Sequence, residues 1–339
     1  MLKKILALLL ISFILSSCSN KIKKEEITFT SWGSITEIEV LKKVITDFEQ
    51  KNPDIKINFI HIPQNYFQKI HLLFASNTAP DVIFINNLYL PIYADKLLDL
   101  SDYINKHDFF PQSLEVLSYK KELLAIPRDI SNLILYYNKD IIEKPPQNFE
   151  ELDKLIKKYS SKNCFGISFE RDVYWAEPYL LTLGHDKGLD YYRKLEGTYA
   201  PTPAQIGSST LLQMFINKKL AFYLSGRWMY PKLKEFRDLN FGIIAFPGKS
   251  PADSSGWAIS KDSKHIPSAI KFVQYLSSKE NIDYLTSTGL IVPARLDSAQ
   301  KLNNEDEAEF LRAISQSEPH VVNKNYKKNR DILNMKLFN

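Results

Sequence analysis

The sequence lacks the compact patterns by which many hydrolases and nucleotide-binding proteins are recognised. No two of its six histidines stand four residues apart, so the His-x-x-x-His arrangement of helical zinc sites is missing. No glycine-rich Gly-x-x-x-x-Gly-Lys-Ser/Thr loop occurs, and the G-I-S-F-E run at 166–170 lacks the second glycine of a nucleophile elbow. We therefore expect neither a metal nor a cofactor. Paired carboxylates of a glycosidase depend on spatial separation, so the sequence leaves that class open.

Blocks of one charge and pairs of cysteines are also missing. Basic and acidic residues are interspersed outside the short segment 21–24, which argues against nucleic acid as a partner. The two cysteines are Cys18 and Cys164. If Cys18 is lipidated, Cys164 has no partner for an intrachain disulfide, and we expect it to be a small buried hydrophobic residue.

The N-terminus has the pattern of an export signal. Lys3 and Lys4 precede an almost unbroken apolar run at 5–15, which is short for a membrane span. The L-S-S-C run ending at Cys18 resembles a bacterial lipobox; the alternative is an ordinary signal peptide with a chance cysteine. We predict a leader at 1–17, a lipidated tether at 18–26, and a protein anchored to the outer face of the cell membrane or held in the periplasm. Loss of the two lysines lowers the net charge from +5 to +3.

The first part of the mature chain alternates strand and helix patterns. Apolar spacing predicts strands at 27–32, 55–60 and 82–85, with helices at 36–52 and 66–76 between them. This order indicates a parallel sheet whose ligand lies beyond the carboxyl ends of the strands. The pairs at 32–33 and 86–87 fall at those ends. The mature chain of roughly 320 residues is longer than a single hydrophobic core usually supports, so two lobes are expected.

A later stretch, 254–295, has a distinctive order of signals. A Gly-Trp pair at 256–257 opens a short extended segment, and Pro267 suits the first turn of a helix. A second helix can begin after Ser277 or Ser278 and end at Gly289, and the stretch leaves through Pro-Ala-Arg at 293–295.

This stretch and seven further motifs resemble the family 1 extracellular solute-binding proteins, the receptors of sugar-type ABC importers. Each motif alone is weak, but their order along 27–295 is that of the family. One of them, FEQKNPDIKI, resembles the family's F-E-x-x-N-P-x-I-x-V turn. The motifs are FTSWG (29–33), FEQKNPDIKI (48–57), APDV (79–82), LLDL (97–100), IP with LYYNKD (126–127 and 135–140), GRWM (226–229) and FPG (246–248).

The resemblance implies a type II periplasmic-binding-protein-like α/β fold: two lobes, each a mainly parallel sheet flanked by helices, with a hinged cleft between them. It implies an N-terminal lobe of 27–128 plus 260–298 and a C-terminal lobe of 129–259 plus 299–339. The segment between Trp175 and Leu211 is short for the family, and the polar C-terminus lacks the pattern of a closing helix. We therefore expect a trimmed second lobe.

The resemblance also places the four tryptophans at strand ends or lobe crossings. A flat ring matches the apolar face of a pyranose, so we expect Trp32 and Trp257 to contact ligand. Replacing either by alanine is then expected to weaken binding while leaving the fold intact. Trp175 and Trp228 either contact ligand or pack at the lobe interface.

Polar candidates would satisfy the hydroxyl rim of such a ligand. Arg128 and Asp129 follow the first crossing and form either a ligand contact or a hinge salt bridge, and Arg295 either binds ligand or pins the returning chain. Arg227, beside Trp228, raises the alternative of an anionic ligand. The remaining candidates, which lie at strand ends or at the crossings, are Gly33, Glu37, Asn86, Asn87 and Gly256.

The resemblance implies a monomeric binding component that closes on a carbohydrate and delivers it to ABC permease subunits, without catalysis. Alternatives that the sequence leaves open are a glycerol phosphate or another anionic solute as ligand, a ligand-sensing lipoprotein without an importer, and a glycosidase-like enzyme.

Overall fold

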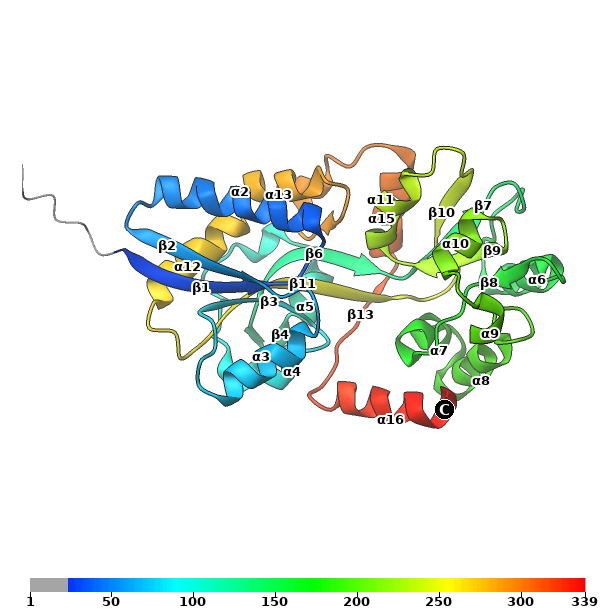
Figure 1. Ribbon diagram of the computed structural model, residues 1–339, viewed down its shortest axis with the longest axis horizontal. Coiled ribbons are helices and arrows are strands. Elements are labelled where there is room, and N and C mark those ends of the chain that lie inside the picture. The colour runs from blue at the N-terminus through cyan, green and yellow to red at the C-terminus, as the bar shows by residue number, and fades with distance from the viewer. Residues whose placement is uncertain (1–23, 339) are drawn as a thin grey trace, which may run out of the picture.

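The computed structural model describes residues 24–338, so the predicted leader, Cys18 and most of the predicted tether lie outside the described residues. Within this range two sheets covered by helices form two lobes that lie end to end (Figure 1). The predicted two-lobe α/β fold is confirmed. Across the described range, no helix combines the length and the apolar character that crossing a membrane requires.

The first lobe is built on a seven-stranded sheet in the order β12-β6-β11-β3-β1-β2, with β13 beside β11. β1 pairs in parallel with β2 and β3, as the β-α-β-α-β pattern predicts. β6 and β11 are antiparallel, because one carries the chain into the second lobe and the other brings it back. The strands are β1 (Glu25–Ser31), β2 (Ile55–His61), β3 (Val82–Asn86), β6 (Ile126–Asn132), β11 (Pro251–Ile259), β12 (Val292–Pro293) and β13 (Glu318–Pro319).

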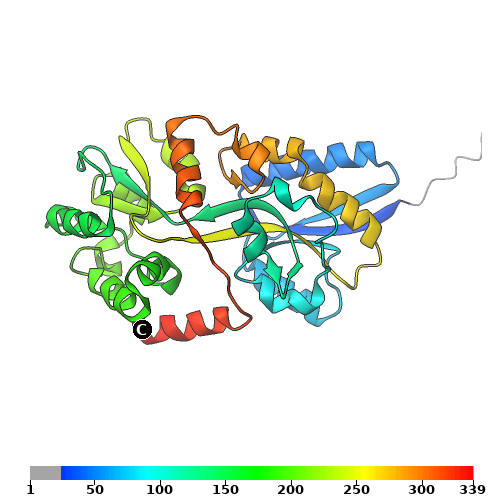
Figure 2. The same ribbon diagram turned by 180° about the vertical axis from the view of Figure 1, so that it is seen from behind.

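Helices cover both faces of this sheet (Figures 1 and 2). The side chains of β3 alternate between two cores: Val82 and Phe84 pack in the core beneath α2, α12 and α13, whereas Ile83 and Ile85 pack in the core with α3 and α4. The helical segments of this lobe are α2 (Ile35–Lys51), α3 (Tyr66–Ala75), α4 (Leu90–Tyr93), η1 (Ala94–Lys96), η2 (Lys106–Asp108), α5 (Pro111–Val116), α12 (Ile266–Leu276), α13 (Lys279–Thr286) and α14 (Leu296–Ala299), with a small hairpin of β4 (Ser118–Tyr119) and β5 (Glu122–Leu123).

Local hydrogen bonds explain the turn motif at 48–57. The Asn52 side chain donates to the carbonyl of Phe48 over 2.8 Å and ends α2. The Glu49 carboxylate accepts the backbone N–H of Ile57 over 2.8 Å, which ties the helix to the start of β2. These side chain–backbone bonds need particular residues at fixed spacing, so the motif is readable in sequence.

The second lobe has a four-stranded sheet in the order β10-β7-β9-β8. Only β8 and β9 are parallel, so the prediction of a mainly parallel sheet is wrong for this lobe. The first sheet is mixed, because β11 runs antiparallel to β3 and β6, and β12 runs antiparallel to β6. β7 continues directly from β6, and its neighbours β9 and β10 both run against it. The elements are β7 (Ile134–Asn138), α6 (Phe149–Tyr159), β8 (Phe165–Ile167), η3 (Val173–Ala176), α7 (Glu177–Leu183), α8 (His185–Leu195), α9 (Pro203–Ile206), α10 (Leu211–Ile216), β9 (Leu220–Ser225), η4 (Arg227–Met229), α11 (Tyr230–Lys234), β10 (Phe241–Ala245), α15 (Glu305–Ser315) and α16 (Tyr326–Phe338).

The C-terminus ends in a helix, which corrects the expectation of a tail without one. α16 lies along the second lobe (Figure 2). It docks mainly through polar groups: Arg330 makes two bonds to Asp172, of 2.6 and 2.5 Å, and the Asn334 side chain accepts the N–H of Val173. Because its contacts are polar, α16 has no apolar stripe by which the sequence would reveal it.

The predicted lobe boundaries at 128/129 and 259/260 remain a prediction. Both β6 and β11 pair within the first sheet over nearly their whole lengths. We therefore propose boundaries nearer 132/133 and 250/251, with the short segments beyond these strands as the hinge.

Candidate functional site

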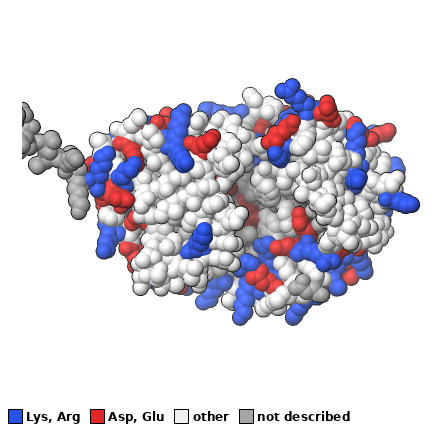
Figure 3. All heavy atoms as spheres, viewed as in Figure 1, with Lys and Arg blue, Asp and Glu red and all other residues white. Residues whose placement is uncertain are grey.

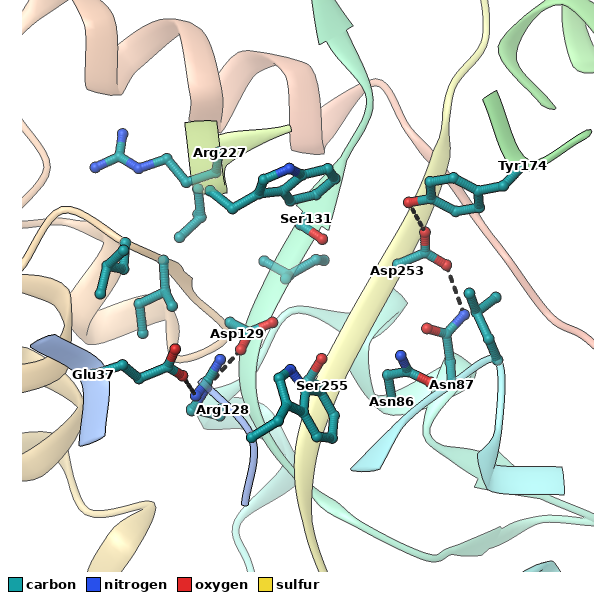
Figure 4. Close-up of a pocket in the computed structure, with 17 residues that line it drawn as sticks. Glu37, Asn86, Asn87, Arg128, Asp129, Ser131, Tyr174, Arg227, Asp253 and Ser255 are labelled. Atoms are coloured by element: carbon teal, nitrogen blue, oxygen red, sulfur yellow. Dashed lines mark hydrogen bonds and ion pairs between the residues drawn. The ribbon is translucent and has the colours of Figure 1, made fainter. Parts of the chain in front are cut away.

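A cavity of about 300 Å³ lies between the two lobes, and the surface is hollowed there (Figure 3). This volume is at the lower end of the range for small-molecule sites. Strand ends and crossings supply its walls (Figure 4). The lining residues are Trp32, Glu37, Asn86, Asn87, Leu88, Arg128, Asp129, Ile130, Ser131, Tyr174, Arg227, Trp228, Asp253, Ser255, Leu290, Ile291 and Val292.

Trp32 forms an aromatic wall on the first lobe. It directly follows β1, and its ring lies 4.3 Å from that of Phe84 and 4.8 Å from that of Tyr66, measured between centroids. Phe67 packs against it at 5.2 Å. These rings support the indole from behind and leave part of it to line the cavity.

Trp228 forms the corresponding wall on the second lobe, with 41% of its surface exposed. Its ring lies over Gly226: a Cβ at that glycine would stand 2.0 Å from Trp228 Cζ3, so only glycine leaves room for the indole. Trp175 meets the Trp228 ring nearly at right angles, with centroids 6.5 Å apart. Trp175 therefore supports Trp228 from outside the cavity wall.

Glu37, Arg128 and Asp129 form a buried charged group in the first-lobe wall. Ser34 caps α2 by accepting the N–H of Glu37, which places this glutamate in the first helical turn. Arg128 donates to the Glu37 carboxylate and, over 2.6 Å, to Asp129, and its guanidinium lies 4.1 Å above the Phe84 ring. Burial alone would lower the pKa of Arg128, but the two carboxylates outweigh it and raise that pKa. Burial raises the pKa of Asp129.

Arg227 reaches the cavity from η4 but is held by a partner of opposite charge. Two of its nitrogens donate to the two carboxylate oxygens of Glu307 on α15, each over 2.7 Å. Its Nε donates to the carbonyl of Gly289 in the first lobe over 2.8 Å, so this side chain also bridges the lobes. The rings of Phe310 and Tyr230 lie 4.4 and 4.7 Å from the guanidinium.

Asp253 on β11 is the third lining carboxylate. It accepts hydrogen bonds from the Asn87 amide and the Tyr174 hydroxyl, both over 2.8 Å (Figure 4). It also contacts His320 Nδ1 at 3.0 Å. Burial by itself would raise the pKa of Asp253, but His320 and the hydrogen-bond donors outweigh it and lower that pKa. Asp253 is therefore a charged residue of the cavity wall whose carboxylate is already bound by Asn87, Tyr174 and His320.

The structure brings seven of the predicted site residues to the cavity and leaves five away from it. Whether the seven contact a ligand remains a prediction. The seven are Trp32, Glu37, Asn86, Asn87, Arg128, Asp129 and Trp228; the five are Gly33, Trp175, Gly256, Trp257 and Arg295.

Trp257 is the main correction. Its side chain is fully buried in the first-lobe core, close to Phe84 and Ile126, and cannot contact a ligand in the cleft. Gly256 serves close packing of strands, because a Cβ there would lie 2.2 Å from the carbonyl oxygen of Ile126. Arg295 binds Asp297 and Asp108 on the first lobe, away from the cavity, which corresponds to the interpretation that it pins the returning chain.

Gly33 acts only indirectly. Its φ is +151°, and a Cβ there would lie 2.7 Å from a carboxylate oxygen of Glu37, so the glycine makes room for that side chain.

Several lining residues were missed from the sequence. Tyr174 directly precedes the candidate Trp175, and Asp253 stands one residue before the distinctive stretch 254–295. Ser131 lies near the end of β6 and Ser255 in the middle of β11, and neither carries a sequence signal, because a single serine in a strand indicates no particular role. His320 lies 67 residues from Asp253, and only the tertiary structure brings them together.

Within residues 24–338, no group of three or more His, Cys, Asp or Glu side chains is arranged to hold a metal ion.

Comparison with known proteins adds a family match and several relatives. The sequence model of a family described as bacterial extracellular solute-binding protein matches residues 43–312. The maltodextrin-binding protein of Bacillus subtilis is 26% identical, over 93% of this chain and 86% of the relative. A maltooligosaccharide ABC transporter solute-binding lipoprotein of Streptococcus pneumoniae is 24% identical, over 58% of this chain and 56% of the relative.

Among solved structures, an ABC substrate-binding protein from Listeria monocytogenes in complex with cycloalternan superposes with a TM-score of 0.81. It is 21% identical, and the match covers 93% of this chain and 92% of that one. At this identity the likeness shows the fold.

Proposed function

Since the chain belongs to the bacterial extracellular solute-binding protein family, we propose that it is the carbohydrate-binding component of an ABC importer. The observation that carries this proposal is the interlobe cavity, which has a tryptophan from each lobe and polar side chains between them. Indole rings suit the apolar face of a pyranose. Asn86, Ser131 and Ser255 supply amide and hydroxyl groups for its hydroxyl rim. The carbohydrates in the names of the relatives agree with this choice.

We propose a neutral sugar rather than an anionic solute. Among the described residues, the cavity lining contains two cations, Arg128 and Arg227, and each is paired with carboxylates of the protein. A phosphate or sugar acid would have to displace these carboxylates or remain unpaired, and an unpaired buried charge is costly. Arg227 therefore does not favour a glycerol phosphate, although its position beside Trp228 suggested one.

Binding would close the two lobes about the short hinge segments, so that each lobe contributes one aromatic wall. A ligand can drive this closure only if it binds the closed form more tightly than the open one. Trp32 and Trp228 lie on opposite lobes, so simultaneous contact with both requires closure. The closed surface would then be presented to the permease subunits, with ATP hydrolysed by a separate protein.

No reaction is required at this site, and we propose that the protein is not an enzyme. Each lining carboxylate, Glu37, Asp129 or Asp253, already accepts a bond from a protein donor. These bonds give each carboxylate a structural role that needs no reaction. We also propose that the protein acts as a monomer, exported and held to the membrane through lipidated Cys18. A sensory lipoprotein without an importer is the alternative, and neighbouring permease genes would distinguish the two.

Replacing Trp228 or Trp32 by alanine is expected to weaken sugar binding by about 2 kcal/mol or more, roughly thirtyfold, because each is a large ring at the centre of the site. Isothermal titration calorimetry with maltotriose measures the change. Phe236→Ala is the matched control, since Phe236 is 38% exposed and lies outside the cavity lining. Equal affinities for wild type and both tryptophan variants would contradict the site assignment.

A thermal-shift screen tests the ligand class. Maltose, maltotriose and raffinose represent neutral sugars, and glycerol 3-phosphate and glucuronic acid represent anions. Native-state binding stabilises by about 2.7 kcal/mol at a hundredfold excess over the dissociation constant. We expect a shift with at least one neutral sugar and none with the anions. A shift with glycerol 3-phosphate alone would contradict the neutral-ligand proposal.

A further inference from the structure

The C-terminal segment from β13 to α16 connects the two lobes a further time. After α15 on the second lobe, β13 adds to the first sheet, where Glu318 N–H donates to Ser250 and His320 N–H donates to Ala252 over 2.9 Å. The chain then returns to the second lobe, where Arg330 of α16 binds Asp172. The sequence family match ends at 312, before this segment.

His320 lies at the crossing point of this segment and is nearly enclosed. Its side chain is 11% exposed. Nδ1 is 3.0 Å from Asp253 on the first sheet, and Nε2 is 3.8 Å from Glu177 on α7 of the second lobe. The Tyr326 ring of α16 meets the imidazole edge-on at 5.3 Å, and the Tyr326 hydroxyl donates to Glu177. The imidazole thus stands between carboxylates of both lobes.

The same group of residues reaches the ligand cavity. Asp253 and Tyr174 both line it, and the hydrogen bond from Tyr174 to Asp253 joins the second lobe to the first. Asn87 binds Asp253 and also donates to the backbone carbonyl of His320 over 3.0 Å. His320 therefore orients a carboxylate whose other oxygen forms an interlobe bond at the cavity wall.

We infer that His320 is a positioning residue which, by binding Asp253 and Glu177, stabilises the closed arrangement of the lobes and makes sugar affinity depend on pH. The effect of His320 on sugar affinity rests on the proposed function. Its effect on lobe closure does not, because closure can be measured without a sugar. It assigns the C-terminal segment a regulatory role in the cleft.

The direction of the pH dependence follows from the groups around the imidazole. Burial alone would lower the pKa of His320, and Arg330 also lowers it, but Asp253 and Glu177 outweigh both and raise that pKa. Asp253 lies on the same sheet as His320, so the attraction that depends on closure is the contact of Nε2 with Glu177 across the lobes, and through this contact closure favours the protonated imidazole. The stabilising effect is fully present below the ordinary pKa of the imidazole and is lost as the pH rises through the raised pKa.

The other titratable groups around His320 limit the pH range over which the protonated imidazole stabilises closure. Burial raises the pKa of Glu177, so this carboxylate is neutralised at a higher pH than an exposed glutamate, which removes part of the attraction on the acid side. Burial is the main cause that raises the pKa values of Tyr174 and Tyr326 above the ordinary value of a phenol, so both phenols stay neutral from acidic to mildly alkaline pH. Affinity is therefore expected to be greatest in mildly acidic solution and to fall toward alkaline pH.

The test compares His320→Gln with wild type by titration calorimetry with maltotriose, or with another sugar that gives a shift in the screen, from pH 6 to pH 8.5. Each unit by which closure raises the pKa corresponds to about a tenfold change in the closing equilibrium. We expect the wild-type dissociation constant to rise by about threefold to tenfold across this range. His320→Gln keeps a hydrogen-bond donor without the charge, so its dissociation constant is expected to stay nearly constant.

His265→Gln is the matched control, because His265 also pairs with a carboxylate, Glu25, at 2.6 Å, but on the first lobe away from the cavity. It should follow the wild-type pH profile. A His320→Gln profile as steep as that of wild type would overturn the inference.

If no sugar in the panel binds, the proposed function fails and the inference is decided on the unliganded protein. The radius of gyration from small-angle X-ray scattering is then compared at pH 6 and pH 8.5. Opening of the wild type at high pH, with His320→Gln open at both values, supports the inference. No change in wild type, or the same change in both proteins, overturns it.

Circular dichroism verifies that His320→Gln is folded. If it is not, Tyr174→Phe replaces it. We then expect the radius of gyration of Tyr174→Phe at pH 6 to be larger than that of wild type, and an unchanged radius would overturn the inference.

Discussion

Replacing Glu307 by alanine is expected to destabilise the protein by about 3–5 kcal/mol, the largest effect of any single charge removal that we predict. Arg227 is 2% exposed, and Glu307 accepts both of its terminal nitrogens over 2.7 Å. Without the carboxylate, Arg227 would remain buried with only the carbonyl of Gly289 as a hydrogen-bond partner. Its charge would then be uncompensated in a poorly solvated place between the lobes. The free energy of unfolding from urea denaturation measures the loss.

Two variants separate this effect from the general loss of a side chain. Glu235→Ala removes an exposed carboxylate that pairs with Lys232, and it should change stability by less than about 1 kcal/mol. The double variant Arg227→Met with Glu307→Leu removes both charges and should recover most of the loss, because no buried ion is left unpaired. A double variant as unstable as Glu307→Ala would show that packing, rather than charge, accounts for the loss.

Replacing Trp257 by alanine is expected to cost about 3–5 kcal/mol of stability, the range for removing a large buried aromatic side chain. Trp257 is fully buried, and its indole packs in the core that α2 and α12 share with the first sheet. The sequence led us to expect instead that this substitution would weaken sugar binding and spare the fold. One expectation is a lower free energy of unfolding and the other is a lower sugar affinity. Urea denaturation and titration calorimetry on the same variant therefore distinguish them.

Trp228→Ala is the natural comparison for Trp257→Ala. Because Trp228 is 41% exposed at the cavity, its removal should cost little stability and much affinity. Trp257→Phe should retain more of the stability than Trp257→Ala, since it keeps one aromatic ring and loses the fused pyrrole ring, whose N–H has no hydrogen-bond partner among the described residues. Trp257→Ala protein with native stability and weakened maltotriose binding would show that this indole serves the ligand rather than the core.

Short-range patterns were readable because short-range physics produces them. The β-α-β-α-β order over the first sheet follows from apolar periodicity, and β1, β2 and β3 pair as that order requires. Pro267 lies in the first turn of α12, and the side chain of Ser278 caps α13. The apolar spacing and the caps that define these elements lie within a few residues of one another, so the sequence alone determined each element, although the pairing of the strands is long-range.

Long-range pairing decided the site, and the strand β11 shows why. Alternation puts Asp253, Ser255 and Trp257 on the same side of the strand. The first two reach the cavity, whereas the core beneath α2 and α12 covers Trp257. How far along a strand its covering helices extend depends on packing between distant segments, and no local pattern reports it.

The charges show the same division. The sequence alone determined the membership of the family, the two-lobe fold and the segments from which the cleft is built. Only the tertiary structure decided that Arg128 meets Glu37 across 91 positions, that Arg227 meets Glu307 across 80, and that His320 meets Asp253 across 67. Local periodicity encodes helices and strands, but the partner of a buried charge is set by which distant surfaces exclude water together.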